Sequence, residues 1–204
     1  MARRQQSSSR PKALGQVRII SGKWRGSKLP VADYDTLRPS PDRVRETLFN
    51  WLGPYLPGAR CLDLFCGTGV LGIEAVSRGA ETATLIDNHP PTIDLLRRQI
   101  ERLEAENVQI LNVDALSWLR TTTPSAFNVI FLDPPFGHGL IESSLDELRR
   151  GWLVDNAWVY LETEKIPILH LESNGWTVRR QGKTRQIEFA LLTATAPGDP
   201  TLAS

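Results

Sequence analysis

Apolar residues along the chain fall into two alternating patterns. Short segments dominated by apolar residues, such as residues 127–132, are typical of strands that are buried on both faces. Between them, apolar residues recur every three or four positions, as at Ile93, Leu96, Ile100 and Leu103, which is the spacing of one helix face. This alternation predicts a doubly wound α/β domain, a Rossmann-like fold with a seven-stranded, mostly parallel sheet and helices on both faces. The expected strands are residues 61–65, 82–86, 108–113, 127–132, 157–162, 176–180 and 186–192, and the expected helices are residues 70–78, 91–104, 115–120 and 140–150.

A different pattern precedes this domain. Residues 17–20 and 28–31 are short apolar segments on either side of a Gly-rich, basic turn, which predicts a β-hairpin. A helix is expected to follow, because Ser40 and Pro41 suit an N-cap and the first helical position. The predicted organisation is a disordered basic tail (1–13), a basic extension of hairpin and helix (14–52), the α/β domain (53–193) and a second disordered tail (194–204).

The composition is that of a globular protein. The chain has 204 residues, of which 41% are hydrophobic and 23% charged, and no apolar run approaches the roughly 20 residues that span a bilayer. Its two cysteines, Cys61 and Cys66, have no histidine nearby, which argues against a zinc site and a disulfide framework. We therefore expect reduced thiols in a cytoplasmic protein, no bound metal, and a monomer.

The charge is unevenly distributed. The net charge of +1 comes from 24 basic and 23 acidic residues. Residues 1–45 hold eleven of the basic and three of the acidic residues, a net charge of +8, which leaves 13 basic and 20 acidic residues and a net charge of −7 for the rest. A basic end on an acidic body indicates contact with a nucleic acid or a membrane surface through that end.

A glycine-rich loop follows the first strand of the predicted sheet. Gly67, Gly69 and Gly72 form a G-x-G-x-x-G pattern between a strand and a helix, where a ligand approaches the backbone closely. Asp87 ends the next strand, 20 residues after Gly67, and an acid there can accept hydrogen bonds from ribose hydroxyls. The pattern predicts a nucleotide-containing ligand, although a structural turn with a surface acid has the same residues.

The acid before the glycines bears on which ligand is bound. Asp63 begins the segment Asp-x-Phe-x-Gly-x-Gly, which also contains Phe65. A carboxylate at this position suits the cationic amino group of a methionyl moiety, whereas it would repel the pyrophosphate of a dinucleotide. We therefore favour S-adenosylmethionine and place Asp63 and Phe65 among the cofactor-binding residues.

A second motif follows the fourth strand, at the same expected edge of the sheet. The two prolines in Asp133, Pro134, Pro135 and Phe136 fix the backbone and remove two donors, which leaves the Asp133 carboxylate and the Pro134 carbonyl as acceptors. Together they can accept both hydrogens of an exocyclic amine on a base, and Phe136 can stack on that base. A plain Asp-Pro turn is the alternative. Asp114, after the third strand, could bind the adenine amino group or cap the helix that follows.

These residues resemble a known family. The glycine loop is similar to the first motif of class I methyltransferases, and the Asp-Pro-Pro-Phe motif to that of their amino-group branch. Two further segments, residues 18–26 and 38–50, resemble those of the RsmD family of bacterial 16S ribosomal RNA guanine-N2 methyltransferases, and the likeness extends over residues 15–192. The resemblance implies S-adenosylmethionine as cofactor, a guanine in 16S ribosomal RNA of the small subunit as substrate, and direct methyl transfer.

The basic extension then acquires a candidate role. Its cations could contact RNA phosphates, and Trp24 could stack on a base or fill the core instead. Arg43 and Arg45 could equally lie on a solvated helix face or close over the cofactor. The predicted RNA-binding residues are Arg18, Lys23, Trp24, Arg25, Arg38, Arg43 and Arg45.

Three other functions remain open from the sequence. An adenine-N6 DNA or RNA methyltransferase would use the same Asp-Pro-Pro-Phe motif, but 204 residues leave little room for the large target-recognition insertion usual in the DNA enzymes. A non-catalytic RNA-binding protein of this fold is disfavoured by the intact Asp63, Gly67, Gly69 and Asp133. A dinucleotide oxidoreductase is disfavoured by the motif that contains Asp133.

Overall fold

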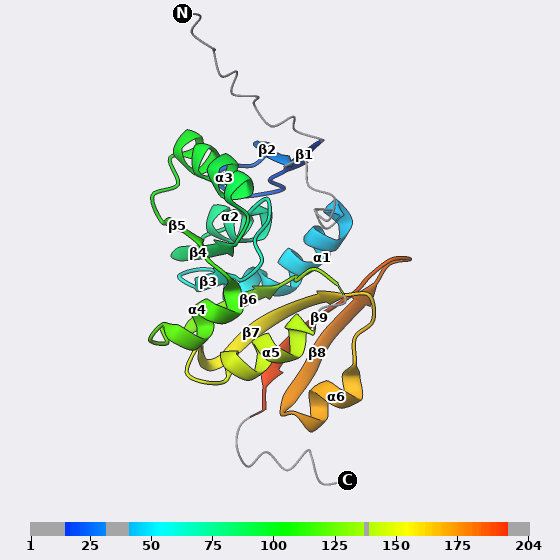
Figure 1. Ribbon diagram of the computed structural model, residues 1–204. Helices are drawn as coiled ribbons and strands as arrows, with labels where there is room; N and C mark the ends of the chain where they lie inside the picture. The colour runs from blue at the N-terminus through cyan, green and yellow to red at the C-terminus, as the bar shows by residue number, and fades with distance from the viewer. Residues whose placement is uncertain (1–14, 32–40, 137–138, 196–204) are drawn as a thin grey trace, which may run out of the picture.

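The computed structural model describes residues 15–31, 41–136 and 139–195. In Figure 1 a twisted sheet has helices against both faces, and a small hairpin lies beside it. The strands are β1 (Gly15–Arg18), β2 (Lys28–Val31), β3 (Arg60–Asp63), β4 (Thr82–Asp87), β5 (Val108–Asn112), β6 (Phe127–Leu132), β7 (Leu153–Thr163), β8 (Trp176–Lys183) and β9 (Glu188–Ala194). The helices are α1 (Asp42–Leu52), the short 3-10 turn η1 (Gly53–Tyr55), α2 (Val70–Ser77), α3 (Pro90–Leu103), α4 (Ala115–Thr121), α5 (Leu140–Leu148) and α6 (Ile168–Ser173).

The main sheet has seven strands in the order β5-β4-β3-β6-β7-β9-β8. The five strands from β5 to β7 are parallel, and β9 is antiparallel to both of its neighbours. From β3 the chain proceeds outward through β4 and β5, and then returns to place β6 on the other side of β3. The order of the strands therefore reverses between β3 and β6, and ligands of such sheets bind beyond the carboxyl ends of the strands at that point. The predicted fold class is confirmed.

Alternation along the strands divides the core into two layers. On β6, Val129 and Phe131 belong to the layer that includes residues of α1, α2 and α3. Ile130 and Leu132 belong to the layer that includes residues of α4, α5 and α6. Because successive side chains of a strand point to opposite faces, a run of consecutive apolar residues fits a strand covered on both sides.

The turn between β1 and β2 docks on α2. The backbone N–H groups of Ile20 and Ser21 donate to the Glu74 carboxylate over 2.7 and 2.9 Å, and the Ser77 hydroxyl donates to the Ser21 carbonyl over 2.7 Å. Gly22 has a φ of +82°, and a Cβ there would lie 1.7 Å from the Ser77 carbonyl oxygen, so only glycine fits. The extension is thus hydrogen-bonded to the helix that follows the glycine loop.

Several elements differ from prediction. β7 begins at Leu153 rather than at residue 157, because Leu153 already pairs with Phe127 of β6. The register of this pairing shifts before Trp158, in a stretch that includes Asn156, whose φ is +62°. Helix α6 was not predicted, since six residues are too few for a helical period to show. β9 continues to Ala194, inside the predicted tail.

The predicted tail at residues 1–13 lies outside the described part of the chain, and so do residues 196–204 of the predicted tail at 194–204. None of the helices within that part is long and apolar enough to cross a bilayer.

Candidate functional site

The carboxyl ends of β3 and β6 bring the two sequence motifs to one edge of the sheet. Asp63, the last residue of β3, is the parallel partner of Phe131, two residues before Asp133. Beyond the paired residues, the Leu64 N–H donates to the Phe131 carbonyl over 3.1 Å, so the segment that follows β3 stays hydrogen-bonded to β6. The predicted cofactor loop and the predicted amine-binding motif therefore start from neighbouring strands.

The glycine loop is shaped by its own packing. Gly67 and Gly69 have φ values of +49° and +71°, a conformation that favours glycine. A Cβ on Gly69 would lie 2.6 Å from a methyl carbon of Leu96, and one on Gly72 would lie 2.2 Å from a methyl carbon of Leu85. A side chain at Gly69 or Gly72 would thus displace the leucines that pack the loop and α2 against β4 and α3, a constraint that exists before any ligand binds.

Asp63 is the buried acid of the site. Only 2% of the residue is exposed, and its Oδ2 accepts a hydrogen bond of 3.1 Å from the Gly72 N–H. Burial, with a smaller contribution from the Asp87 charge, raises the pKa of its carboxyl to about 7, against the lowering effect of that hydrogen bond. Among the described residues no Lys or Arg forms an ion pair with Asp63. A cation bound here would stabilise the ionised form.

The two cysteines are buried thiols beside this acid. Burial, followed by the charge of Asp63, raises the pKa of Cys61 to about 12, and the same causes raise the pKa of Cys66. Thiols of this kind are poor nucleophiles, so neither is a candidate for covalent chemistry.

The two acids after β4 and β5 have clear local roles. Asp87 Oδ2 accepts from the Gly67 N–H over 3.0 Å, and its Oδ1 accepts from the His89 N–H over 2.8 Å, so this carboxylate connects the end of β4 to the glycine loop. Asp114 caps α4, because its Oδ1 accepts from the Ser117 N–H over 2.8 Å. The helix cap is one of the two roles that the sequence suggests for Asp114. Its other suggested role, contact with an adenine amino group, remains a prediction.

A cavity of about 190 Å³ lies against the last three residues of the Asp-Pro-Pro-Phe motif. Asp133 is half-buried, Pro134 is buried, and the Phe136 side chain projects with 42% of the residue exposed. An exposed aromatic ring beside a cavity is available for stacking on a planar ligand. The lining consists of Pro134, Pro135, Phe136, Gly139, Leu140, Ile141, Glu142 and Thr163.

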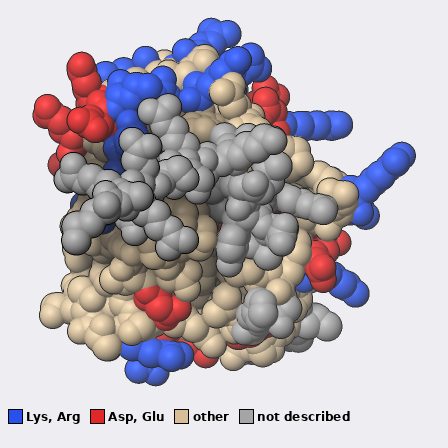
Figure 2. Space-filling view, turned by 45° about the horizontal axis from the view of Figure 1, so that its top comes forward, with Lys and Arg blue, Asp and Glu red and all other residues tan. Residues whose placement is uncertain are grey.

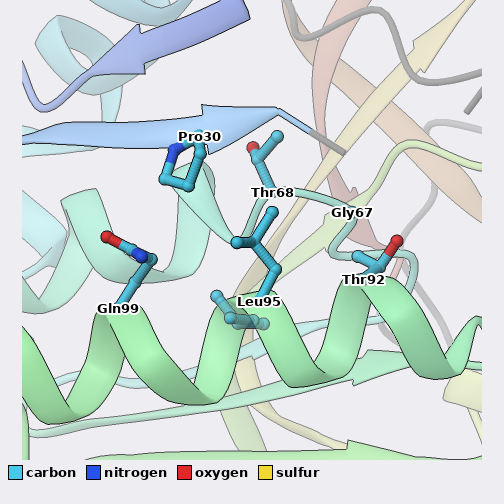
Figure 3. Close-up of a pocket in the computed structure, with 7 residues that line it drawn as sticks. Pro30, Gly67, Thr68, Thr92, Leu95 and Gln99 are labelled. Carbon is cyan, nitrogen blue, oxygen red and sulfur yellow. The ribbon is translucent and has the colours of Figure 1, made fainter. Parts of the chain in front are cut away.

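The hairpin also reaches the glycine loop. Figure 3 shows Pro30 of β2 facing Thr68 of the glycine loop and Leu95 and Gln99 of α3 across a small cavity. Its volume is only about 10 Å³, which is near the lower limit for one water molecule. The space is therefore a small gap between packed side chains, and β2 lies directly against the glycine loop and α3.

The predicted RNA-binding residues separate into exposed and buried groups. Arg18, Lys23, Arg25 and Arg43 are exposed, and Figure 2 shows Lys and Arg side chains gathered over the upper part of the molecule, where Figure 1 has the hairpin. Arg38 lies outside the described residues.

Burial argues against contact of Trp24 and Arg45 with RNA, and for Trp24 it favours the alternative role in the core. Trp24 is only 7% exposed, with the Lys23 ammonium 5.0 Å from its ring centre, so it fills the core and does not present a face to a base. Arg45 is fully buried, where it pairs with Asp42, donates to the Arg18 carbonyl over 2.9 Å and lies 3.8 Å from Glu74. Both residues hold the extension on the α/β domain, so neither can reach an RNA strand in this structure.

Two residues of this docking site escaped sequence reasoning. Glu74 is fully buried, and its carboxylate also accepts from Arg78 Nε over 2.7 Å. Ser77 is 5% exposed and accepts from the Trp24 N–H over 3.0 Å. The available signal was Glu74 itself, a single acid in an otherwise apolar helix.

Across the described residues no group of three or more His, Cys, Asp and Glu side chains could hold a metal ion.

Comparison with known proteins gives consistent matches over nearly the whole chain. Residues 17–193 match the protein family described as Conserved hypothetical protein 95. The chain is 44% identical over 187 residues to Ribosomal RNA small subunit methyltransferase D of Escherichia coli (strain K12), which covers 91% of this chain and 93% of the relative. It is 41% identical over 185 residues to the protein of the same name from Haemophilus influenzae, covering 89% and 95%.

Solved structures agree in fold. A putative methyltransferase from Escherichia coli superposes with a TM-score of 0.78 at 41% identity, covering 90% of this chain and 100% of that one. A putative methylase from Haemophilus influenzae superposes with a TM-score of 0.72 at 37% identity, covering 89% and 99%.

Proposed function

Because the chain belongs to the Conserved hypothetical protein 95 family, the RsmD family that its motifs indicate, we propose that it methylates the exocyclic N2 amine of one guanine in small-subunit (16S) ribosomal RNA, with S-adenosylmethionine as methyl donor. The observation that carries this proposal is the meeting of two motifs at one switch point. The loop with the buried acid follows β3, and the amine-binding motif follows the adjacent strand β6. The site is thus suited to a cationic cofactor and an aminated base side by side.

The residues around the glycine loop fit this cofactor. Asp63 is a buried acid whose raised pKa would fall on binding of the methionyl ammonium, so the ligand would supply the counter-charge that no ion pair provides within the described part of the chain. Asp87 lies beside the Gly67 N–H and offers further acceptor positions to ribose hydroxyls. Phe65, which is half-buried, Gly69 and Asp114 complete the proposed binding residues. When bound, S-adenosylmethionine supplies an electrophilic methyl group on a sulfonium.

The protein's part in the transfer is to position the amine. The lone pair of an exocyclic amine is delocalised into its ring, which makes it a poor nucleophile. The Asp133 carboxylate and the Pro134 carbonyl accept its two hydrogens, which weakens that conjugation and directs the lone pair toward the methyl. The same acceptors stabilise the positive charge that develops on nitrogen, and the Asp133 carboxylate can take the proton that this nitrogen gives up when the sulfonium leaves as a neutral thioether. Phe136 stacks on the base after it has been turned out of its own stack.

The exposed cations of the extension hold the substrate. Arg18, Lys23, Arg25 and Arg43 are exposed and can contact phosphates, and Arg38 is proposed for the same role. Because the hairpin is hydrogen-bonded to α2 and packs on the glycine loop, RNA bound to it would have a defined position relative to the cofactor.

The test is transfer of a labelled methyl group from S-adenosylmethionine to purified small ribosomal subunits, to naked 16S ribosomal RNA and to duplex DNA. Label is expected on a guanine N2 of the ribosomal RNA. Label only on DNA, or only on adenine N6, would show that the proposed substrate is wrong, and silence of the protein toward S-adenosylmethionine in calorimetry would indicate a binding protein without catalysis.

A further inference from the structure

A second group of cations lies at the far end of the main sheet from the hairpin. The segment from Trp176 to Ile187, which includes β8, contains four basic residues and no acidic residue. All four of these basic residues are exposed. We refer to Arg180, Lys183 and Arg185 as the basic ribbon. It stands out because the chain after residue 45 carries a net charge of −7.

The basic ribbon lies at the same edge of the sheet as the amine-binding motif. Thr163, at the carboxyl end of β7, lines the cavity beside Pro134. It pairs with Glu188, the first residue of β9, and Glu188 pairs with Lys183 of β8. Two steps between strands span about 10 Å, so the turn after Lys183 begins that far from the cavity wall. In Figure 1 this turn is the end of the β8–β9 hairpin that projects on the right of the view.

The ribbon is held in a defined orientation. A register shift between Val178 and Arg180 leaves Arg179 as an extra residue in β8, and its Nε donates to the Thr193 hydroxyl over 2.9 Å. Closer to the tip, the ring of Phe189 lies over Gly182, where a Cβ would approach a ring carbon to 2.4 Å. Phe189 also stacks on Trp51 of α1 at 5.5 Å. The β8–β9 hairpin is therefore packed against α1 of the same structure, so the cations of the basic ribbon have a defined position.

The charges of the ribbon are not neutralised within the described part of the chain. None of the ion pairs there includes Arg180, Lys183 or Arg185. The nearest acid in the pairing, Glu188, accepts a hydrogen bond of 2.9 Å from the Ile166 N–H instead. Uncompensated Lys and Arg side chains beside a site that acts on RNA form a phosphate-binding surface.

We propose that the basic ribbon is a second RNA contact, which binds backbone phosphates flanking the target base on the side of the cavity away from the β1–β2 hairpin. This inference rests on the proposed function, because it takes the Asp-Pro-Pro-Phe cavity as the position of the target base. Two phosphate contacts, one on each side of that position, would hold the RNA strand while a single nucleotide enters the cavity.

The experiment compares two double variants of the full chain that lose the same charge. R180Q/R185Q removes two ribbon cations, and R120Q/R150Q removes two exposed arginines at the opposite edge of the sheet, where α4 and α5 end. Binding to naked 16S ribosomal RNA and to small subunits is measured between about 50 and about 300 mM salt, a range over which phosphate contacts weaken strongly. Affinity for S-adenosylmethionine and thermal unfolding are measured in parallel to confirm that both variants are folded.

The ribbon variant is expected to bind RNA about tenfold more weakly, with a slope of log K against log salt that is smaller by about 1.5, while cofactor affinity is unchanged. The control variant should bind as the wild type does. Equal losses in both variants, or no loss in either, would overturn the proposal; the latter would leave the cations only the role of keeping an edge strand from pairing with another chain. Loss on subunits but not on naked RNA would overturn it in favour of a ribosomal protein as partner. Failure of the proposed function is told apart from failure of this inference by a different measurement, because the wild-type protein would then transfer no methyl group to ribosomal RNA.

Discussion

Replacing Asp63 with asparagine is expected to make the ligand-free protein more stable and to weaken its affinity for S-adenosylmethionine. The Asp63 carboxyl is buried and its pKa is raised from 3.8 to about 7, so the folded protein holds this proton more tightly than the unfolded chain does. The stabilising effect of that proton is complete below pH 3.8 and is lost as the pH rises through about 7. At pH 8 the ionised carboxylate therefore costs the fold about 4 kcal/mol relative to a neutral group of the same shape.

The asparagine side chain in Asp63→Asn would keep an oxygen for the Gly72 N–H, so the gain in stability should not be offset by a lost hydrogen bond. The expected increase in the free energy of unfolding is about 4 kcal/mol at pH 8 and about 2 kcal/mol at pH 5.5. In a chain of this length the larger value raises Tm by roughly 10 °C. Loss of the charge that faces the methionyl ammonium should raise the dissociation constant of S-adenosylmethionine about tenfold to a hundredfold.

Chemical and thermal unfolding at pH 5.5 and 8, with and without S-adenosylmethionine, measure both effects. Asp146→Asn, which changes an exposed aspartate on α5, is the control and should change neither quantity. An Asp63→Asn protein that is less stable than wild type at pH 8, or whose stability gain is the same at both pH values, would refute the pKa argument. Unchanged cofactor affinity would refute the assignment of the ammonium to Asp63.

Three further substitutions separate the roles proposed here. Asp133→Ala should lower turnover about a hundredfold or more while S-adenosylmethionine still binds in calorimetry, and near wild-type turnover would remove Asp133 from the mechanism. Asp87→Ala should raise the cofactor dissociation constant about tenfold, because the Gly67 N–H loses its acceptor, with little change in turnover at saturation; an unchanged constant would contradict this role. Arg45→Ala should lower the free energy of unfolding by about 3–5 kcal/mol, whereas Arg43→Ala should change it by less than about 0.5 kcal/mol and weaken RNA binding; similar unfolding curves for both would show that the buried network contributes no stability.

The fold was predictable because its local signals agree with one another. Consecutive apolar residues in strands such as β6 identify a sheet covered on both faces, and helix spacing between the strands identifies the crossovers. The position of the site followed from the same reasoning, since loops after parallel strands must share one edge. Asp63 and Asp133 accordingly lie at one edge of the sheet, as the sequence predicts, and the strand order of the structure adds that their strands are neighbours.

The interpretation of the basic extension was less successful because charge alone does not reveal burial. Arg45 resembles Arg43 in the sequence, yet the register of α1 directs one guanidinium into a network with Glu74 and leaves the other exposed. Trp24 is buried because its backbone is hydrogen-bonded to Ser77, 53 residues away. Contacts of this range depend on how the extension docks, and the local sign of the docking site is Glu74, a single acid in an otherwise apolar helix.

The most direct test of the central proposal is mass spectrometry of ribosomal RNA from a strain that lacks this protein. In that strain one guanine of the small-subunit RNA should lack its N2 methyl group, and the wild-type chain should restore the methyl group while the Asp133→Ala chain should not. An unchanged methylation pattern of the small-subunit RNA, or a methyl group missing from an adenine instead, would contradict it.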